Sequence, residues 1–172
     1  FSLSNLSDFD PKKDIKNELR IEDRYVIYRL NKILILIRDS YNNYDFISIV
    51  KAITNFTIEL SQWYFDIIKD ELYCDSYNSL SRRQSQTTIY YILEKLLLAL
   101  NPILPHTCEE AYQLFNKLNK KQSINLEEFP ETLDVVFSDN ELNMMKNFFK
   151  LKDEIYNKLE IARQDGLLKK PN

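Results

Sequence analysis

The sequence predicts an all-α protein, an antiparallel bundle of about five helices that forms a single domain over residues 1–172. Three observations support this prediction. The chain contains one glycine, Gly166, and tight hairpins and phosphate-cradling loops depend on that residue. Hydrophobic residues make up 44% and charged residues 28%, which is typical of globular proteins. Apolar residues recur at steps of three and four along most of the chain, as in amphipathic helices.

The first two helices are predicted over residues 22–42 and 46–73. The first carries an apolar stripe at helical spacing, formed by Val26, Leu30, Ile33, Ile37 and Tyr41. The second carries a longer stripe, formed by Phe46, Ile49, Ile53, Phe56, Leu60, Trp63 and Ile67. Asp45 is placed to cap the N-terminus of this second helix. The stripe is compatible with a straight helix and with a kinked one.

A third helix is predicted over residues 79–101, because the apolar pattern stops at Pro102, which cannot continue a helix. Its inward face is predicted to hold Ile89, Leu93, Leu96 and Leu100. Its second half is apolar on almost all sides, which predicts a central position in the bundle. A short fourth helix is predicted from Pro105 or His106 to Leu118, since proline suits the first turn.

Residues 119–138 are polar and interrupted by proline, so they are predicted to form an irregular connection. Apolar residues that could attach it to the bundle are Leu126, Phe129, Leu133 and Val136. The last long helix is predicted over residues 139–166, with Ser138 or Asp139 as its cap and Gly166 at its end. One side of this helix carries Met144, Phe148, Leu151, Ile155, Leu159 and Ala162.

The sequence does not indicate a membrane protein. The longest apolar runs, residues 33–37 and 96–100, are much shorter than the roughly 20 residues of a spanning helix. Residues 1–10 contain two aspartates and no basic residue, so they do not resemble a signal peptide. We therefore expect a reducing compartment, the cytoplasm or an organelle matrix.

We expect no catalytic residue and no metal site in this chain. The two cysteines, Cys74 and Cys108, are far apart in sequence, and the single histidine, His106, cannot complete a metal site with them. A cysteine nucleophile needs a nearby base. His106 lies two residues from Cys108, a spacing at which helical side chains do not face each other.

The charge distribution gives a mixed indication. A net charge of −3 and a pI near 5.3 argue against non-specific nucleic-acid binding. However, Arg82 and Arg83 stand in the first turn of the third helix, where the helix dipole disfavours cations. Arginine is the side chain best shaped to bind phosphate through two parallel hydrogen bonds. Other basic groups are Lys117, Lys120 and Lys121, and the C-terminal pair Lys169 and Lys170.

Several motifs resemble the anticodon-binding domain of isoleucyl-tRNA synthetases of the bacterial and organellar type. They are WYFDIIKDELY (63–73), RRQSQTTIYYI (82–92), NPILPHTCEEAY (101–112) and SINLEEFP (123–130). The third motif is similar in the valine, leucine and methionine enzymes, whereas DIIKDELY and RRQSQT resemble the isoleucine enzyme. The opening LSNLSDFDP (3–11) resembles the segment that leads into this domain from a catalytic core.

The resemblance implies a domain that binds the anticodon stem-loop of tRNA(Ile) and positions that tRNA for ATP-dependent aminoacylation. The ATP-binding signatures HIGH and KMSKS are absent from the sequence. We therefore expect ATP and the catalysis to belong to the rest of the synthetase chain, and no cofactor in this one. We expect a monomer. The alternatives are the equivalent domain of the valine or leucine enzyme, and a helical scaffolding bundle that binds no RNA.

The predicted RNA contacts combine this resemblance with residue chemistry. Lys69, Arg82 and Arg83 are predicted to contact phosphates, with Gln86 as a polar partner one turn beyond Arg82. Tyr73 stands at a helix end and is predicted to be exposed for base stacking.

Two other residues near these contacts are interpreted differently. Trp63 lies on the apolar stripe of its helix and is predicted to belong to the core. Glu71 departs from the family pattern, which commonly has a basic residue at this position, and so weakens the prediction of a phosphate-binding surface at this helix end.

Overall fold

The computed structural model describes residues 1–13, 15 and 18–166, and these residues form helices and connecting segments without a strand. The predicted all-α fold is confirmed. The single domain predicted over residues 1–172 stays a prediction, and the described residues divide into two compact units, the first ending at Val135 and the second beginning at Val136. Their boundary lies within the connection predicted over residues 119–138. The C-terminal lysine pair predicted as a basic tail lies outside the described residues.

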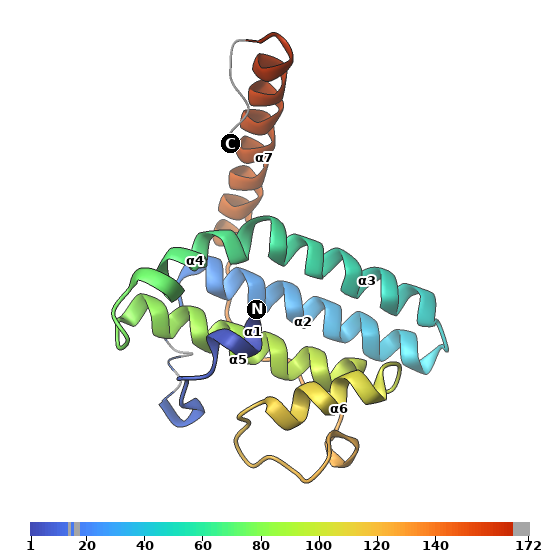
Figure 1. Ribbon diagram of the computed structural model, residues 1–172. Helices are drawn as coiled ribbons and strands as arrows, with labels where there is room; N and C mark the ends of the chain where they lie inside the picture. The colour runs from blue at the N-terminus through green and yellow to red at the C-terminus, as the bar shows by residue number, and fades with distance from the viewer. Residues whose placement is uncertain (14, 16–17, 167–172) are drawn as a thin grey trace. The chain divides into compact units, whose positions relative to one another are not determined.

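In the first unit, α2 (Ile21–Asn42) and α3 (Phe46–Glu59) form an antiparallel hairpin (Figure 1). Val26, Leu30 and Ile37 of α2 are buried, as the apolar stripe predicted. The Asp45 side chain accepts a hydrogen bond from the backbone N–H of Ser48 at 3.1 Å, which confirms the predicted cap. Capping matters here because the first turn of a helix has no intrahelical acceptors for its N–H groups.

The second predicted helix is helical from Phe46 to Cys74, but it is not α-helical throughout. A π-helical turn, Leu60–Tyr64, separates α3 from α4 (Phe65–Cys74). Such a turn inserts one extra residue into the helical repeat, so the buried side moves forward by one position. Ile67 was predicted to face inward, but it is 46% exposed, while Ile68 is fully buried.

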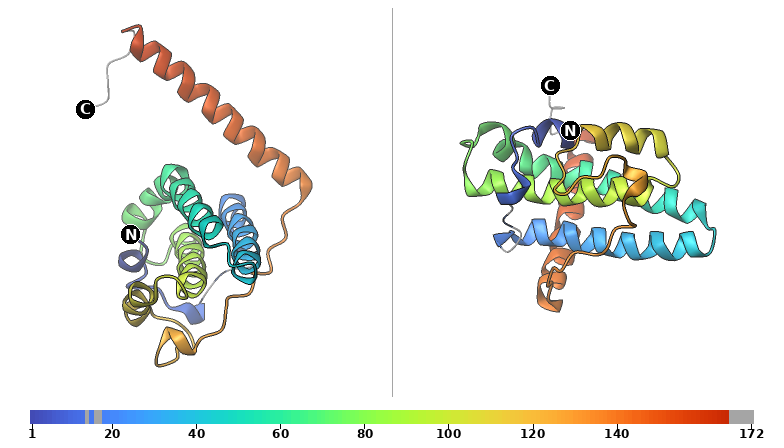
Figure 2. Two further views of the ribbon diagram at one scale, coloured as in Figure 1. Left: turned by 90° about the vertical axis from the view of Figure 1, so that its right-hand side faces the viewer. Right: turned by 90° about the horizontal axis from the view of Figure 1, so that it is seen from below.

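The central helix of the first unit is α5 (Leu80–Leu100), which packs against α1 (Ser2–Asn5), α2, α4 and α6 (Pro105–Leu114). The left view of Figure 2 shows α2, α3 and α5 almost end-on, with α2 packed against both α3 and α5. The central position was predicted from the apolar second half of α5. The continuously buried part is instead its polar first half, Gln84 to Tyr90. Gln84, Ser85 and Gln86 are tolerated there because each is hydrogen-bonded to another element.

The connection after α6 has little regular structure, as predicted, apart from a 3-10 turn at Ile124–Leu126. Ile124 is buried and attaches the connection to the first unit, whereas Leu126, which was predicted to do so, is 58% exposed. The Phe129 ring lies edge-on to Tyr41 of α2. A second attachment is formed by Asn31, whose side chain exchanges hydrogen bonds with both backbone groups of Leu133.

The second unit contains α7 (Asp139–Gln164). Ser138 and Glu141 form a capping box at its start, as the serine at this position predicted. Gly166 follows its end with φ of 72°, a left-handed conformation that glycine adopts without a steric penalty. Among the described residues of both units, no helix combines the length and apolarity needed to cross a membrane.

Candidate nucleic-acid interface

The predicted RNA contacts lie at one end of the helical hairpin formed by α4 and α5. Lys69 and Tyr73 belong to the second half of α4, and Arg82, Arg83 and Gln86 belong to the first two turns of α5. We call this region, residues 69–86 with the turn between the two helices, the α4–α5 corner (Figure 1). The corner forms because α4 ends at Cys74 and Ser79 caps α5 by accepting from the backbone N–H of Arg82 at 3.3 Å.

Lys69 and Tyr73 are both accessible. The Lys69 side chain is 50% exposed, and its Nζ donates to Oδ1 of Asp66 at 2.6 Å. This hydrogen bond raises the pKa of Lys69 above its ordinary value, so the ammonium group is charged at neutral pH. Tyr73 is 64% exposed, as predicted, and its hydroxyl accepts from Nδ2 of Asn5 at 3.4 Å.

Arg82, Arg83 and Gln86 converge on Asp8 of the N-terminal segment, and we call these four residues the Asp8 cluster. Nη2 of Arg82 donates to Oδ2 of Asp8 at 2.9 Å, and Nε2 of Gln86 donates to Oδ1 of the same carboxylate at 2.7 Å. Nη1 of Arg83 donates to the backbone oxygen of Asp8 at 3.3 Å. Burial by itself raises the pKa of Asp8, but the hydrogen bonds from Arg82 and Gln86 outweigh burial and hold that pKa below its usual value.

The Asp8 cluster gives the two arginines a role within the chain. Their side chains are only 15% and 17% exposed, and Gln86 is fully buried. Arg82 also donates to the backbone oxygen of Leu72 at the end of α4. These residues therefore join the N-terminal segment to the α4–α5 corner. Their predicted contact with phosphate stays a prediction.

Tyr77, which lies in the turn between α4 and α5, was not among the residues predicted to contact RNA. Its side chain is 58% exposed, and the Arg83 guanidinium lies 4.8 Å from its ring centroid. A cavity of about 110 Å³ adjoins this ring and is also lined by Asn78. The signal in the sequence was an aromatic residue inside the short polar loop DSYNS, because loops run over the protein surface and often carry binding residues.

Glu71, the departure from the family pattern, belongs to a polar network beneath the corner. Its carboxylate accepts hydrogen bonds from Arg20 and Ser85. Arg20 also binds the fully buried Asp23 through Nε at 2.8 Å, and Asp23 accepts from the Tyr64 hydroxyl at 2.6 Å. Burial and then the neighbouring Asp23 raise the pKa of Tyr64 well above its ordinary value. Glu71 therefore has a partner of opposite charge within this chain.

The lysines after α6 are also engaged within the first unit. Lys117 is paired with Glu94 at 3.6 Å and Glu127 at 3.4 Å. Lys120 lies over the Tyr112 ring, 5.1 Å from its centroid. These lysines stabilise the connection that follows α6.

Comparison with known proteins identifies the family. Residues 23–172 match the model of the anticodon-binding domain of tRNA ligase. The chain is 41% identical over its whole length to an isoleucine–tRNA ligase of Ureaplasma parvum serovar 3, of which it covers 19%. It is 39% identical to the isoleucine–tRNA ligases of Mycoplasmoides gallisepticum and Pediococcus pentosaceus, and covers 19% and 18% of them.

The chain thus spans about a fifth of the length of the curated relatives that it matches. The all-α architecture agrees with that match. The chain belongs to the family of anticodon-binding domains of tRNA ligases.

Proposed function

We propose that the chain binds the anticodon stem-loop of an isoleucine tRNA and so positions that tRNA for aminoacylation by a catalytic region outside this chain. The observation that carries the proposal is the identity of about 40% to isoleucine–tRNA ligases along all of the chain. Positioning a tRNA requires contacts with phosphates, and stacking of unpaired loop bases on aromatic rings. The α4–α5 corner offers groups of both kinds.

Within the corner, Lys69 and Tyr73 are the first candidates for contact, because both are exposed. Lys69 would bind a phosphate, and Tyr73 would stack on a base. The second candidates for contact are Arg82, Arg83 and Gln86. A phosphate would have to share their hydrogen-bond donors with Asp8. Replacing both arginines by alanine tests this. A salt slope that flattens by about one to two units supports phosphate contact, and an unchanged slope excludes it.

The proposal is tested by measuring binding of the chain to transcripts of isoleucine, valine and leucine tRNA at several salt concentrations. We expect tighter binding of the isoleucine transcript and an affinity that falls as salt rises, because phosphate contacts release counterions. Preference for valine or leucine tRNA would favour the equivalent domain of those enzymes. Absence of binding to every transcript at low salt, together with a stable oligomer, would favour a scaffolding bundle.

The remaining partners are proposed on the same basis. We propose that ATP binds to parts of the synthetase outside this chain, that those parts contact this domain, and that the chain is monomeric. The compartment would be the cytoplasm or an organelle matrix, where tRNA is aminoacylated. Size-exclusion chromatography with light scattering tests the monomer, which a concentration-dependent increase in mass would exclude.

A further inference from the structure

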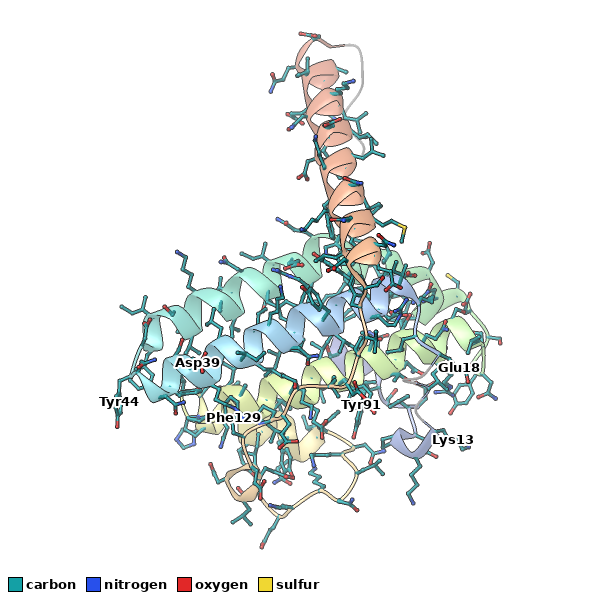
Figure 3. The ribbon with its side chains drawn as sticks, turned by 180° about the vertical axis from the view of Figure 1, so that it is seen from behind. Lys13, Glu18, Asp39, Tyr44, Tyr91 and Phe129 are labelled. Atoms are coloured by element: carbon teal, nitrogen blue, oxygen red, sulfur yellow. The ribbon has the colours of Figure 1, made fainter. Side chains whose placement is uncertain are left out.

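The cavity beside Tyr77 is a small polar pocket between the N-terminal segment and the α4–α5 turn. We call it the Tyr77 pocket. It has a volume of about 110 Å³, and the residues that concern its chemistry are Asp8, Asp10, Lys13, Tyr77, Asn78 and Arg83. Figure 3 labels Lys13 on the N-terminal segment, on the opposite side of the view from Tyr44. The pocket adjoins the α4–α5 corner, which contributes Tyr77, Asn78 and Arg83 to its lining.

The charges of the pocket favour a neutral ligand. The lining contains two carboxylates, Asp8 and Asp10, and two cations, Lys13 and Arg83, so its charges balance. The lowered pKa of Asp8 keeps its carboxylate ionised at neutral pH. A phosphate would therefore meet negative charge as well as positive charge. A neutral group that carries both hydrogen-bond donors and acceptors fits this lining better.

The walls of the pocket offer both kinds of hydrogen-bond partner. Arg83 donates to Oδ1 of Asn78 through Nη2 at 3.2 Å, which orients the amide so that its nitrogen can still donate. The Asp10 carboxylate accepts, and the Lys13 ammonium donates. The Tyr77 hydroxyl reaches the backbone oxygen of Asp8 at 3.4 Å, which ties the ring to the rim of the pocket.

The Tyr77 ring supplies a stacking surface at the rim. The Arg83 guanidinium covers one face at 4.8 Å from the centroid, and the side chain remains 58% exposed. Unpaired RNA bases are bound by proteins through stacking on aromatic rings and hydrogen bonds to the base edge. We propose that the Tyr77 pocket binds one unpaired nucleobase of the RNA, which stacks on Tyr77 and places its polar edge against Asn78. This inference rests on the proposed RNA binding and adds a specific site to it.

The test compares the chain with its Tyr77→Ala and Tyr77→Phe variants in binding an RNA hairpin with the stem and loop of the isoleucine anticodon arm. We expect Tyr77→Ala to weaken binding roughly 5- to 100-fold, the range found for loss of one stacked base. Tyr77→Phe keeps the ring and should bind within about twofold of the unchanged chain. The salt slope should not change, because stacking releases no counterions.

A matched control is Tyr156→Ala. Tyr156 of α7 is also 58% exposed and also packs with a cation, Lys152, at 5.6 Å from its ring centroid. Its replacement should leave hairpin affinity unchanged. Circular dichroism melting should show all three variants folded, since neither tyrosine is buried.

The base itself is located with hairpins that lack one loop base at a time. At one position, loss of the base should weaken binding by the same factor as Tyr77→Ala, and the two changes together should cost no more than either alone. The pocket assignment is overturned if Tyr77→Ala binds normally, if the effects add at every position, or if Tyr156→Ala weakens binding equally. In those cases the RNA-binding proposal stands as long as the unchanged chain binds the hairpin. If that chain binds no RNA, the proposed function fails as well.

Discussion

At the scale of single residues, Asp8 shows how a charged side chain can hold two parts of the first unit together. One carboxylate accepts from Arg82 and Gln86, and its own backbone oxygen accepts from Arg83. Hydrogen bonds that involve a charged group are stronger than those between neutral groups. The sequence offered Arg82 and Arg83 as an unusual pair of cations in a first helical turn. It offered no sign that Asp8 was their partner.

Asp8→Asn should lower the free energy of unfolding by about 1–3 kcal/mol at neutral pH, because the arginines lose a charged acceptor. The pKa of Asp8 is lowered in the folded chain, so its contribution to stability is present above the unfolded value of about 3.9 and is lost as pH falls through the folded value. Urea unfolding of both proteins from neutral to acid pH measures this. The difference should be constant above about pH 5 and shrink at lower pH.

The exposed Asp70 provides the control for this change. Asp70→Asn should alter stability by no more than about 0.5 kcal/mol. A stability difference for Asp8→Asn that does not depend on pH would contradict the role given to the carboxylate.

Lys69→Ala should weaken binding to isoleucine tRNA and flatten the salt slope by about one unit, as expected for loss of one phosphate contact. The change should not affect folding, because the Lys69–Asp66 pair is exposed and exposed pairs contribute little to stability. Lys51 of α3, also exposed and outside the corner, is the comparison, and Lys51→Ala should leave the slope unchanged. Equal slopes for all three proteins would place Lys69 outside the interface.

At the scale of elements, the π-helical turn decides which face of α4 is buried. The apolar stripe of α3 continues with unchanged spacing into α4 in the sequence, so a regular helix would bury Ile67. The extra residue at Leu60–Tyr64 shifts the phase, and Ile68 and Leu72 are buried instead. The turn also brings Tyr64 into the core, where its hydroxyl reaches Asp23.

The shift is tested by truncating the two adjacent isoleucines of α4. Ile68→Ala should lower the free energy of unfolding by about 2–5 kcal/mol, the usual cost of a large-to-small change in a packed core. Ile67→Ala removes a side chain that is 46% exposed and should cost less than about 1 kcal/mol. Urea denaturation of both variants gives the comparison. The reverse order of the two costs would mean that α4 continues the phase of α3.

At the scale of the whole molecule, a polar network links four elements of the first unit. Arg20 and Asp23 come from the start of α2, Tyr64 from the π-helical turn, Glu71 from α4 and Ser85 from α5. Such a network stabilises one arrangement of the helices, because each buried group needs its partner. The second unit, with α7, is stabilised at its start by its own capping box.

Glu71→Arg places a cation beside Arg20 and is expected to destabilise the chain by about 1–4 kcal/mol, since two cations then adjoin. The loss should be smaller when Arg20 is also replaced by alanine, because the repulsion is removed. Thermal melting of the unchanged chain, the two single variants and the double variant completes a double-mutant cycle. Additive losses would show that Arg20 and Glu71 do not interact.

Much of the fold was determined by the sequence through local physical effects. The apolar periodicity predicted α2, the helical segment of α3 and α4, α5 and α7, and Pro105 predicted the start of α6, whereas the short α1 was not predicted. Asp45 and Ser138 predicted helix starts, because their side chains accept from backbone N–H groups within the first turn. Gly166 predicted the end of α7 because its conformation is left-handed. These effects act over a few residues, so the sequence alone expresses them.

The tertiary structure decided what depends on contacts between residues distant in sequence. The sequence indicated that Arg82, Arg83 and Gln86 are polar and close to one another. Only the folded chain placed Asp8 beside them, more than 70 residues away. Likewise, the pocket at Tyr77 exists because the N-terminal segment returns to the α4–α5 turn. The helices were set by local periodicity, whereas the chemistry of the candidate interface depended on which segments meet.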